Sequence, residues 1–157
     1  MPSLQHSLRD AFFDELRFYR LHHKHPLNWR LHALCVPVEA ISALVFTAYL
    51  SPALPTLIST LMALYASLLD PPRTLVPGAL VTVCLGPVAE AVFLWSGDES
   101  ACWVAALLHI SSWALQVGVG HRLIEGNTPG MVELLTANSV VLSPLLAVHP
   151  YPPPKLF

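Results

Sequence analysis

The stretch YRLHHKHPLNWRLHALCVP, from Tyr19 to Pro37, decides how the rest of the chain is organised. It contains four of the chain's eight histidines: His22, His23, His25 and His32. Charged and amphipathic residues precede it, and long apolar segments follow it. A dense group of imidazoles at the edge of an apolar domain favours a metal site at a membrane surface. From this stretch alone, a basic interfacial loop that holds the first span against lipid headgroups is the alternative.

The composition indicates an integral membrane protein. Hydrophobic residues make up 54% of the 157 residues and charged residues only 11%, against about a quarter in a typical soluble domain. The mean hydropathy is +0.57. The formal net charge of −2 does not indicate a nucleic-acid partner. We expect residues 1–157 to form one membrane-embedded domain.

The N-terminal part of the chain has too many charges for a cleavable signal peptide. We therefore expect the N-terminus to stay in the cytosol and the first span to be an uncleaved anchor. Residues 6–22 predict an amphipathic helix, since Leu8, Phe12, Leu16 and Tyr19 repeat at intervals of three and four. Pro26 should end any helix that passes through His25.

Five apolar segments follow, separated by turns rich in proline, glycine and acidic residues. They are residues 34–50, 56–69, 74–95, 101–119 and 131–148. Because surface helices of soluble proteins have a charged face, these segments favour a membrane protein over a soluble helical bundle. Several are shorter than the ~20 residues of a spanning helix, so a re-entrant hairpin at 51–70 is an alternative for the second.

The predicted fold is therefore an all-α, polytopic membrane helix bundle of four to five apolar helices, with an amphipathic N-terminal helix. The histidine-rich motif (23–32) precedes the bundle (33–149), and a proline-rich tail follows it (150–157). We expect Asn28 to cap the helix after Pro26.

The positions of Lys and Arg predict which segments share a membrane face. Five of the eight precede residue 31, which places that end in the cytosol by the positive-inside rule. Four spans later, the segment from His121 to Gly130 returns as a loop on the same side. The first histidine cluster and His121 can therefore contribute to one site.

The spacing around His121 indicates which side chains can cooperate. His121 and Glu125 are four residues apart, so they lie on one face of a helix. Gln116 lies five residues before His121, with Gly118 and Gly120 between them. A π-bulge there would bring Gln116 back to the His121 face, and such bulges are frequent at functional sites. Several histidines with a carboxylate and open positions are typical of oxygen-activating iron.

These motifs resemble a known family. The pattern Tyr19-x3-His23-x4-Asn28-x3-His32-x4-Pro37, followed by Trp113-x2-Gln116, Gly120-His121-x3-Glu125 and Pro129, is similar to the family of the yeast 2-hydroxy fatty acid dioxygenase. That enzyme shortens 2-hydroxy fatty acids from phytosphingosine breakdown by one carbon. The resemblance implies Fe²⁺, O₂, a 2-hydroxy fatty acid substrate and, in eukaryotes, the endoplasmic reticulum membrane. The positive-inside rule places the site at the cytosolic face of that membrane. Here the chain reads Gln-Val-Gly-Val-Gly-His instead of Gln-x-x-Gly-His, which puts the role of Gln116 in doubt.

The resemblance also implies roles for individual residues. His23, His32 and His121 correspond to metal ligands, and Glu125 is a fourth catalytic residue, as ligand or as partner of a ligand. Further residues would orient these ligands or contact substrate: Tyr19, Asn28 and Gln116. We expect His109 and His149 to lie away from this site. Three carboxylates in or near spans are expected to bond neighbouring helices: Glu39, Glu90 and Glu133.

Other functions also fit the residues. A zinc-dependent lipid hydrolase would use the same imidazoles to activate water. A non-enzymatic membrane scaffold would need them only at the interface. A metal transporter would need ligands through the membrane depth, whereas these histidines gather at one face.

Overall fold

The computed structural model describes the chain except for residues 1–9, 11–12, 15–16, 70–71 and 130–157. The described part is built from helices: α2 (Pro26–Ala48), α3 (Leu54–Leu69), α4 (Pro72–Ser96), α5 (Asp98–Ala114) and the π-helix η1 (Leu115–Glu125). The described residues from 10 to 22 are helical as well. These elements confirm the predicted all-α membrane helix bundle. The fifth apolar segment, 131–148, lies outside the described residues.

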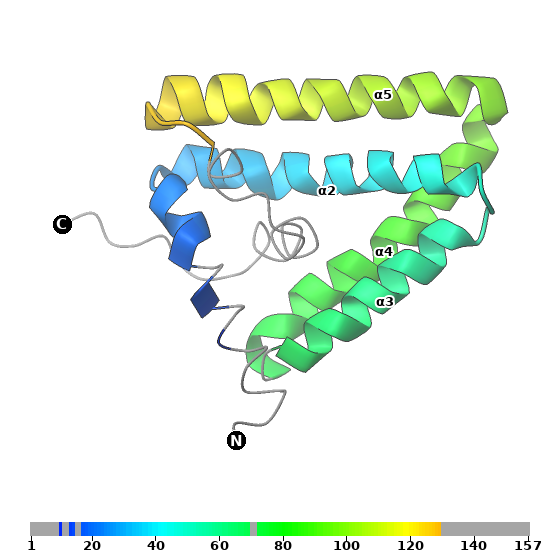
Figure 1. Cartoon of the computed structure of the whole chain (residues 1–157), viewed down its shortest axis with the longest axis horizontal. Coiled ribbons are helices and arrows are strands. Elements are labelled where there is room, and N and C mark those ends of the chain that lie inside the picture. Colours follow the sequence, from blue (N-terminus) through cyan, green and yellow to red (C-terminus); the bar gives the residue numbers. More distant parts are fainter. Residues whose placement is uncertain (1–9, 11–12, 15–16, 70–71, 130–157) are drawn as a thin grey trace.

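The helices form two antiparallel pairs (Figure 1). α2 lies along α5 and η1, and α3 lies along α4. The two pairs meet at one end of the molecule and diverge toward the other. Because α2 and α5 run in opposite directions, the first turns of α2 and the last turns of η1 lie at the same end.

The apolar core fills the corner where α2, α4 and α5 meet. Small side chains let the helices approach closely there, as at many helix contacts in membranes. The buried residues of this corner are Leu44, Val45, Ala48, Leu85, Ala89, Phe93, Ala101 and Ala105. The corner lies at the opposite end of α2 from the histidine-rich motif.

Three helices are long and apolar enough to cross a membrane: Pro26–Ala48, Ala79–Ser96 and Ser100–Glu125. Large apolar side chains cover the outside of the bundle, with Trp95 88% and Trp103 73% exposed. Both observations support membrane association. The second apolar segment forms one continuous helix, α3, and not a re-entrant hairpin. Its 16 residues span only about 24 Å.

The prediction for the start of α2 was wrong. Asn28 is not the N-cap, because the helix begins at Pro26 and His25 is its N-cap. Proline suits the first helical position, since a backbone N–H there would have no partner within the helix. The His25 ring accepts a hydrogen bond from the Leu27 backbone N–H at 3.2 Å. Asn28 therefore lies within the first turn of α2, where it is fully buried.

The last helix also extends further than predicted. The segment from His121 to Gly130 was expected to return as a loop, but the helix continues to Glu125. This confirms the other expectation for the segment, that His121 and Glu125 lie on one helix. The predicted π-helical geometry is present, and it extends beyond a local bulge: all eleven residues from Leu115 to Glu125 are π-helical. Gly126 ends the helix in the left-handed conformation, with φ of 67°, which glycine adopts without strain.

Candidate metal centre

His23 directly follows the N-terminal helix, whose last described helical residue is His22. The final carbonyls of a helix have no partner within it. The carbonyl of Tyr19 accepts a hydrogen bond from His23 Nδ1 at 2.6 Å. The Tyr19 ring also stacks on the His23 ring, with centroids 3.8 Å apart and planes at 13°. These two contacts fix the orientation of the His23 imidazole.

His32 and His121 are held in the same way by different acceptors. On α2, His32 Nδ1 lies 3.0 Å from the backbone oxygen of Asn28. On η1, His121 Nδ1 lies 3.0 Å from Asn127 Oδ1. The Asn127 amide in turn donates to the carbonyl of His22 at 3.4 Å, which orients its oxygen toward His121. Carbonyl and amide oxygens only accept hydrogen bonds, so Nδ1 is the protonated nitrogen in both rings.

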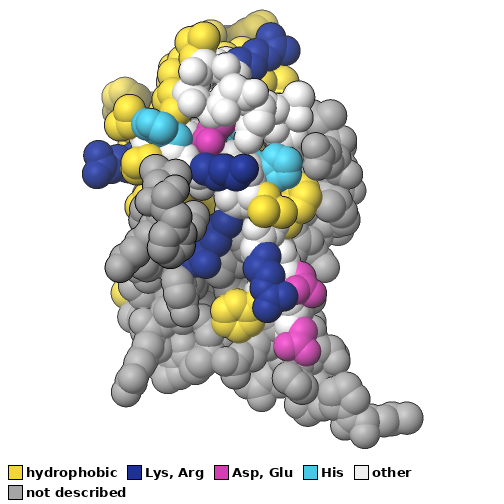
Figure 2. Space-filling model, turned by 90° about the vertical axis from the view of Figure 1, so that its left-hand side faces the viewer, with side chains coloured by type: hydrophobic (Ala, Val, Ile, Leu, Met, Phe, Trp, Pro, Cys, Tyr) yellow, Lys and Arg dark blue, Asp and Glu magenta, His cyan; other side chains and the backbone are white. Residues whose placement is uncertain are grey.

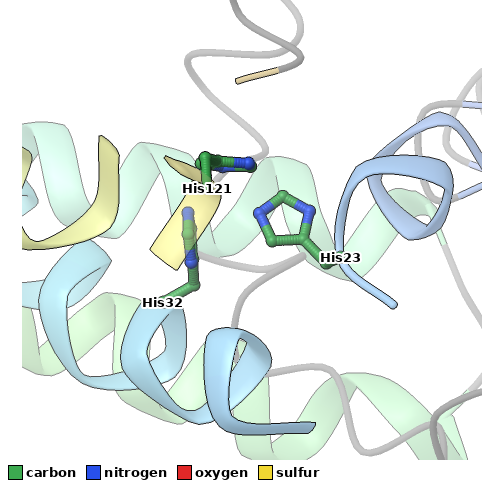
Figure 3. A group of neighbouring side chains, drawn as sticks. All are labelled: His23, His32 and His121. Atoms are coloured by element: carbon green, nitrogen blue, oxygen red, sulfur yellow. The ribbon is translucent and has the colours of Figure 1, made fainter. Parts of the chain in front are cut away.

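The three rings converge, as the sequence predicted (Figure 3). They come from the end of the N-terminal helix, from α2 and from η1, and they point toward one another. One ligand nitrogen from each ring lies within 4.8 Å of those from the other two. Two ligands bound at ~2.0–2.2 Å to one ion are at most about 4.4 Å apart, so the three nitrogens must move closer together to hold an ion.

The electrostatics of the cluster favour neutral imidazoles. Exposure is 8% for His23, 6% for His32 and 2% for His121. Burial lowers the pKa of His23 well below its ordinary value, and repulsion from His32 lowers it further. Because His23 Nδ1 carries the proton, its Nε2 has a free lone pair, and this buried atom has no hydrogen-bond partner. A lone pair of this kind is what a metal ion requires of a histidine ligand.

Glu125 joins the two ends of the chain beside the histidines. Its Oε1 accepts hydrogen bonds from the His25 backbone N–H at 2.7 Å and from Asn28 Nδ2 at 3.1 Å. Glu125 is not in the group of residues whose ligand atoms converge. A catalytic role for Glu125 stays a prediction.

Gly120 permits the contact between η1 and α2. A Cβ atom at this position would overlap Asn28 Oδ1 and lie 3.3 Å from a methyl group of Leu31. A side chain here would therefore push the two helices apart. Close approach matters because α2 supplies His32 and η1 supplies His121.

The carboxylates Glu39 and Glu90 bond to neighbouring helices, as predicted. Gln116 donates to Glu39 across the α2–η1 contact at 2.6 Å. Ser42 Oγ of α2 and His109 Nδ1 of α5 are 2.9 Å apart and form a hydrogen bond. His109 is not in the converging group of His23, His32 and His121. Thr56 of α3 donates to Glu90 of α4 at 2.9 Å. Glu133 and His149 lie outside the described residues.

The end of the molecule that contains the site is basic (Figure 2). Lys and Arg side chains surround histidines and a carboxylate on this face. The described basic residues that are exposed before and after the site are Arg17, Lys24, Arg30 and Arg122. His25 is exposed and caps α2, whereas His22 is partly buried beside Phe18, with ring centroids 4.8 Å apart.

Asn127 is the residue that sequence reasoning missed. The stretch Gly-Asn-Thr-Pro-Gly at 126–130 was interpreted only as a turn. The sequence did contain a signal for this role. Asn127 directly follows Gly126, a typical helix-ending residue, and an amide side chain at that place can reach back to the last helical turn. Asn127 does so through both its backbone N–H, which donates to the His121 carbonyl at 3.1 Å, and its side chain.

The fold and the site together define a class: a small all-α membrane protein with a buried three-histidine cluster at one end of the bundle. Comparison with known families agrees with this class. Residues 10–148 match the family described as "2-hydroxy-palmitic acid dioxygenase Mpo1-like". The chain belongs to this family. Searches of curated proteins and of solved structures found no match.

Proposed function

We propose that this protein is an Fe²⁺-dependent dioxygenase that converts 2-hydroxy fatty acids to fatty acids one carbon shorter. The observation that carries the proposal is the convergence of three buried histidines whose Nδ1 atoms are all engaged by oxygen acceptors. Family membership supports the substrate class and the use of oxygen. Bound iron would supply the oxygen chemistry, and His23, His32 and His121 would hold it.

The overall reaction balances with one molecule of O₂. The bond between C1 and C2 of the 2-hydroxy acid breaks, C2 becomes the new carboxyl carbon, and C1 leaves as CO₂. The substrate loses four electrons and O₂ gains four, so R–CH(OH)–COOH and O₂ give R–COOH, CO₂ and H₂O. No further reductant is needed, which suits a protein whose described residues suggest a single metal group.

The charge of the site favours an acidic substrate. Three neutral imidazoles leave the two positive charges of Fe²⁺ uncompensated, and Glu125 is engaged with His25 and Asn28. A carboxylate on the substrate would balance this charge where water is excluded and electrostatic interactions are strong. The surrounding basic residues would attract the same carboxylate from solution.

The acyl chain of the substrate fits the apolar surroundings. Leu27 and Leu34 of α2 are 53% and 68% exposed, and Leu123 of η1 is 78% exposed. We propose that the chain extends along the apolar surface of these helices with its head at the histidines. We also propose that the basic end faces the cytosol, in the membrane of the endoplasmic reticulum, following the positive-inside rule.

The test is oxygen uptake by purified protein loaded with Fe²⁺ in detergent, with 2-hydroxypalmitic acid as substrate. We expect one O₂ consumed for each pentadecanoic acid formed, and no product from palmitic acid. Zn²⁺-loaded protein is the matched control and should be inactive. Hydrolysis of an ester or amide lipid by the Zn²⁺-loaded protein, with no oxygen uptake from 2-hydroxypalmitic acid, would instead support a lipid hydrolase.

A further inference from the structure

The Tyr19 hydroxyl is a buried polar group without a hydrogen-bond partner. Buried hydroxyl groups in proteins are almost always hydrogen-bonded, because the alternative is costly. The described part of the chain has only a few such unsatisfied side-chain atoms, and three of them belong to residues around the metal centre: Tyr19 Oη, His23 Nε2 and Asn28 Oδ1. Each therefore requires an explanation.

Two of these atoms are explained by the site itself. His23 Nε2 carries a lone pair and lies beside the other two imidazoles, where a metal ion would be its partner. Asn28 Oδ1 is covered by η1, since it occupies the place where a side chain of Gly120 would begin. Tyr19 Oη has neither explanation. Its ring nevertheless lies in the cluster, stacked on His23 and edge-on to His32 with centroids 6.4 Å apart.

The chemistry of the hydroxyl indicates its partner. A tyrosine hydroxyl is protonated at neutral pH, with an ordinary pKa of ~10, so it can donate a hydrogen bond to an anion. Glu125, whose carboxylate oxygen is bonded to His25 and Asn28, does not take this bond. The anion expected at the histidines is the carboxylate of the substrate.

We propose that the Tyr19 hydroxyl donates a hydrogen bond to the carboxylate of the bound 2-hydroxy acid and holds it against the three-histidine cluster. This inference rests on the proposed function. Tyr19 then has two separate duties. Its carbonyl and ring orient His23, and its hydroxyl binds substrate, so removing the hydroxyl alone leaves the first duty intact.

Tyr19→Phe tests the inference, measured by binding of 2-hydroxypalmitic acid to Co²⁺-loaded protein through the visible spectrum of the metal. We expect Co²⁺ binding to be unchanged and the Kd for the acid to rise about 10- to 100-fold, as for one hydrogen bond to a charged group. The Kd for 1,2-hexadecanediol, which lacks the carboxylate, should not change. Tyr49→Phe, at the far end of α2, is the matched control and should bind the acid like the native protein.

Thermal stability gives an independent readout. An unpaired hydroxyl destabilises the protein without substrate, so Tyr19→Phe should melt at the same temperature or higher, yet gain less than the native protein when the acid is added. An unchanged Kd for the acid, or an equal loss of affinity for acid and diol, would overturn the inference. So would a lower melting temperature without substrate, which would mean that the hydroxyl is structural. Failure of the native protein to bind the acid would instead remove the proposed function itself.

Discussion

The two ends of α2 pack against the neighbouring helices by different chemistry. At one end, Leu44, Val45 and Ala48 meet small and apolar side chains of α4 and α5. At the other, His32 and Asn28 meet the π-helix η1 through hydrogen bonds and imidazole rings. Among the described residues, the apolar end has no buried side-chain nitrogen or oxygen without a hydrogen-bond partner, whereas the polar end keeps His23 Nε2 without one. The first arrangement is typical of a fold-stabilising core and the second of a binding site.

Substitution of a candidate ligand should show the difference between the two ends most strongly, because it should remove metal binding without unfolding the protein. We expect His121→Ala to lose the metal ion and more than about 100-fold of the activity, exceeding the ~10–100-fold typical of residues that only orient ligands. Little apolar contact is removed, so the variant should still fold. Metal analysis and oxygen uptake on the purified variant measure both effects.

His109→Ala is the matched control for this experiment. His109 lies on the same continuous helix as His121 but bonds Ser42 and not the metal group. We expect full metal content and a loss of about 0.5–1.5 kcal/mol in stability, because the Ser42 hydroxyl keeps its bond to the Glu39 carbonyl and loses only the one to His109. If His109→Ala lost the metal and His121→Ala kept it, the division between the two ends would be wrong.

Glu125 can be tested by a pair of substitutions. A Gln oxygen can accept both hydrogen bonds that Glu125 Oε1 accepts from His25 and Asn28, whereas Ala accepts none. If Glu125 acts by holding these two residues, Glu125→Ala should lower kcat/KM about 10- to 100-fold and Glu125→Gln much less. Equal, severe losses in both would instead favour Glu125 as a metal ligand.

Gly120 and Gly118 form a second matched pair. Ala at Gly120 would overlap Asn28, whereas nothing lies within 4 Å of a Cβ at Gly118. We expect Gly120→Ala to cost about 1–3 kcal/mol and to weaken metal binding by moving α2 away from η1. Gly118→Ala should be neutral or stabilising by up to about 1 kcal/mol, since Ala favours helix. Melting temperature and a metal-binding titration measure the two outcomes, and equal effects would contradict the close approach at Gly120.

Much of the fold and the site could be predicted from the sequence. Uncharged apolar segments predicted the bundle, and the Lys and Arg positions predicted that His121 meets the first histidine cluster. The five-residue spacing from Gln116 to His121 predicted π-helical geometry, and Gln116 and His121 are both buried on η1. These features depend on local patterns that are visible in the chain itself.

Other features could not be predicted, because they depend on distant contacts. Asn28 looks like a helix cap in sequence, but Pro26 starts the helix two residues earlier and leaves the Asn28 side chain to bond Glu125. The amide of Asn127 directly after Gly126 indicated a bond back to the last helical turn, but its bond to the His22 carbonyl, which orients its oxygen toward His121, is a distant contact. Gln116 on η1 donates to Glu39, 77 residues earlier in the chain, and a local sequence pattern does not show this partner.

A further expected effect concerns pH and the metal-free protein. The pKa of His23 is lowered by burial, so between this pKa and the ordinary value of ~6.5 the unfolded chain binds a proton that the folded chain does not. Stability should therefore fall as pH decreases below about 6.5, by about 2 kcal/mol at pH 5. Urea unfolding of chelator-treated protein in detergent measures this slope. His23→Asn should make the slope shallower, because one of the three buried imidazoles is removed. A native slope that is flat or reversed would contradict a buried, neutral His23.

The central claim is that three histidines from three separate segments hold one metal ion. The most direct measurement is the iron content of purified native protein and of the single variants His23→Ala, His32→Ala and His121→Ala, after loading with Fe²⁺ and removal of excess metal. The account predicts one iron per native chain and a large loss of bound iron in each variant, while the His109→Ala control retains it. A native protein that binds no iron, or variants that all retain it, would contradict the account.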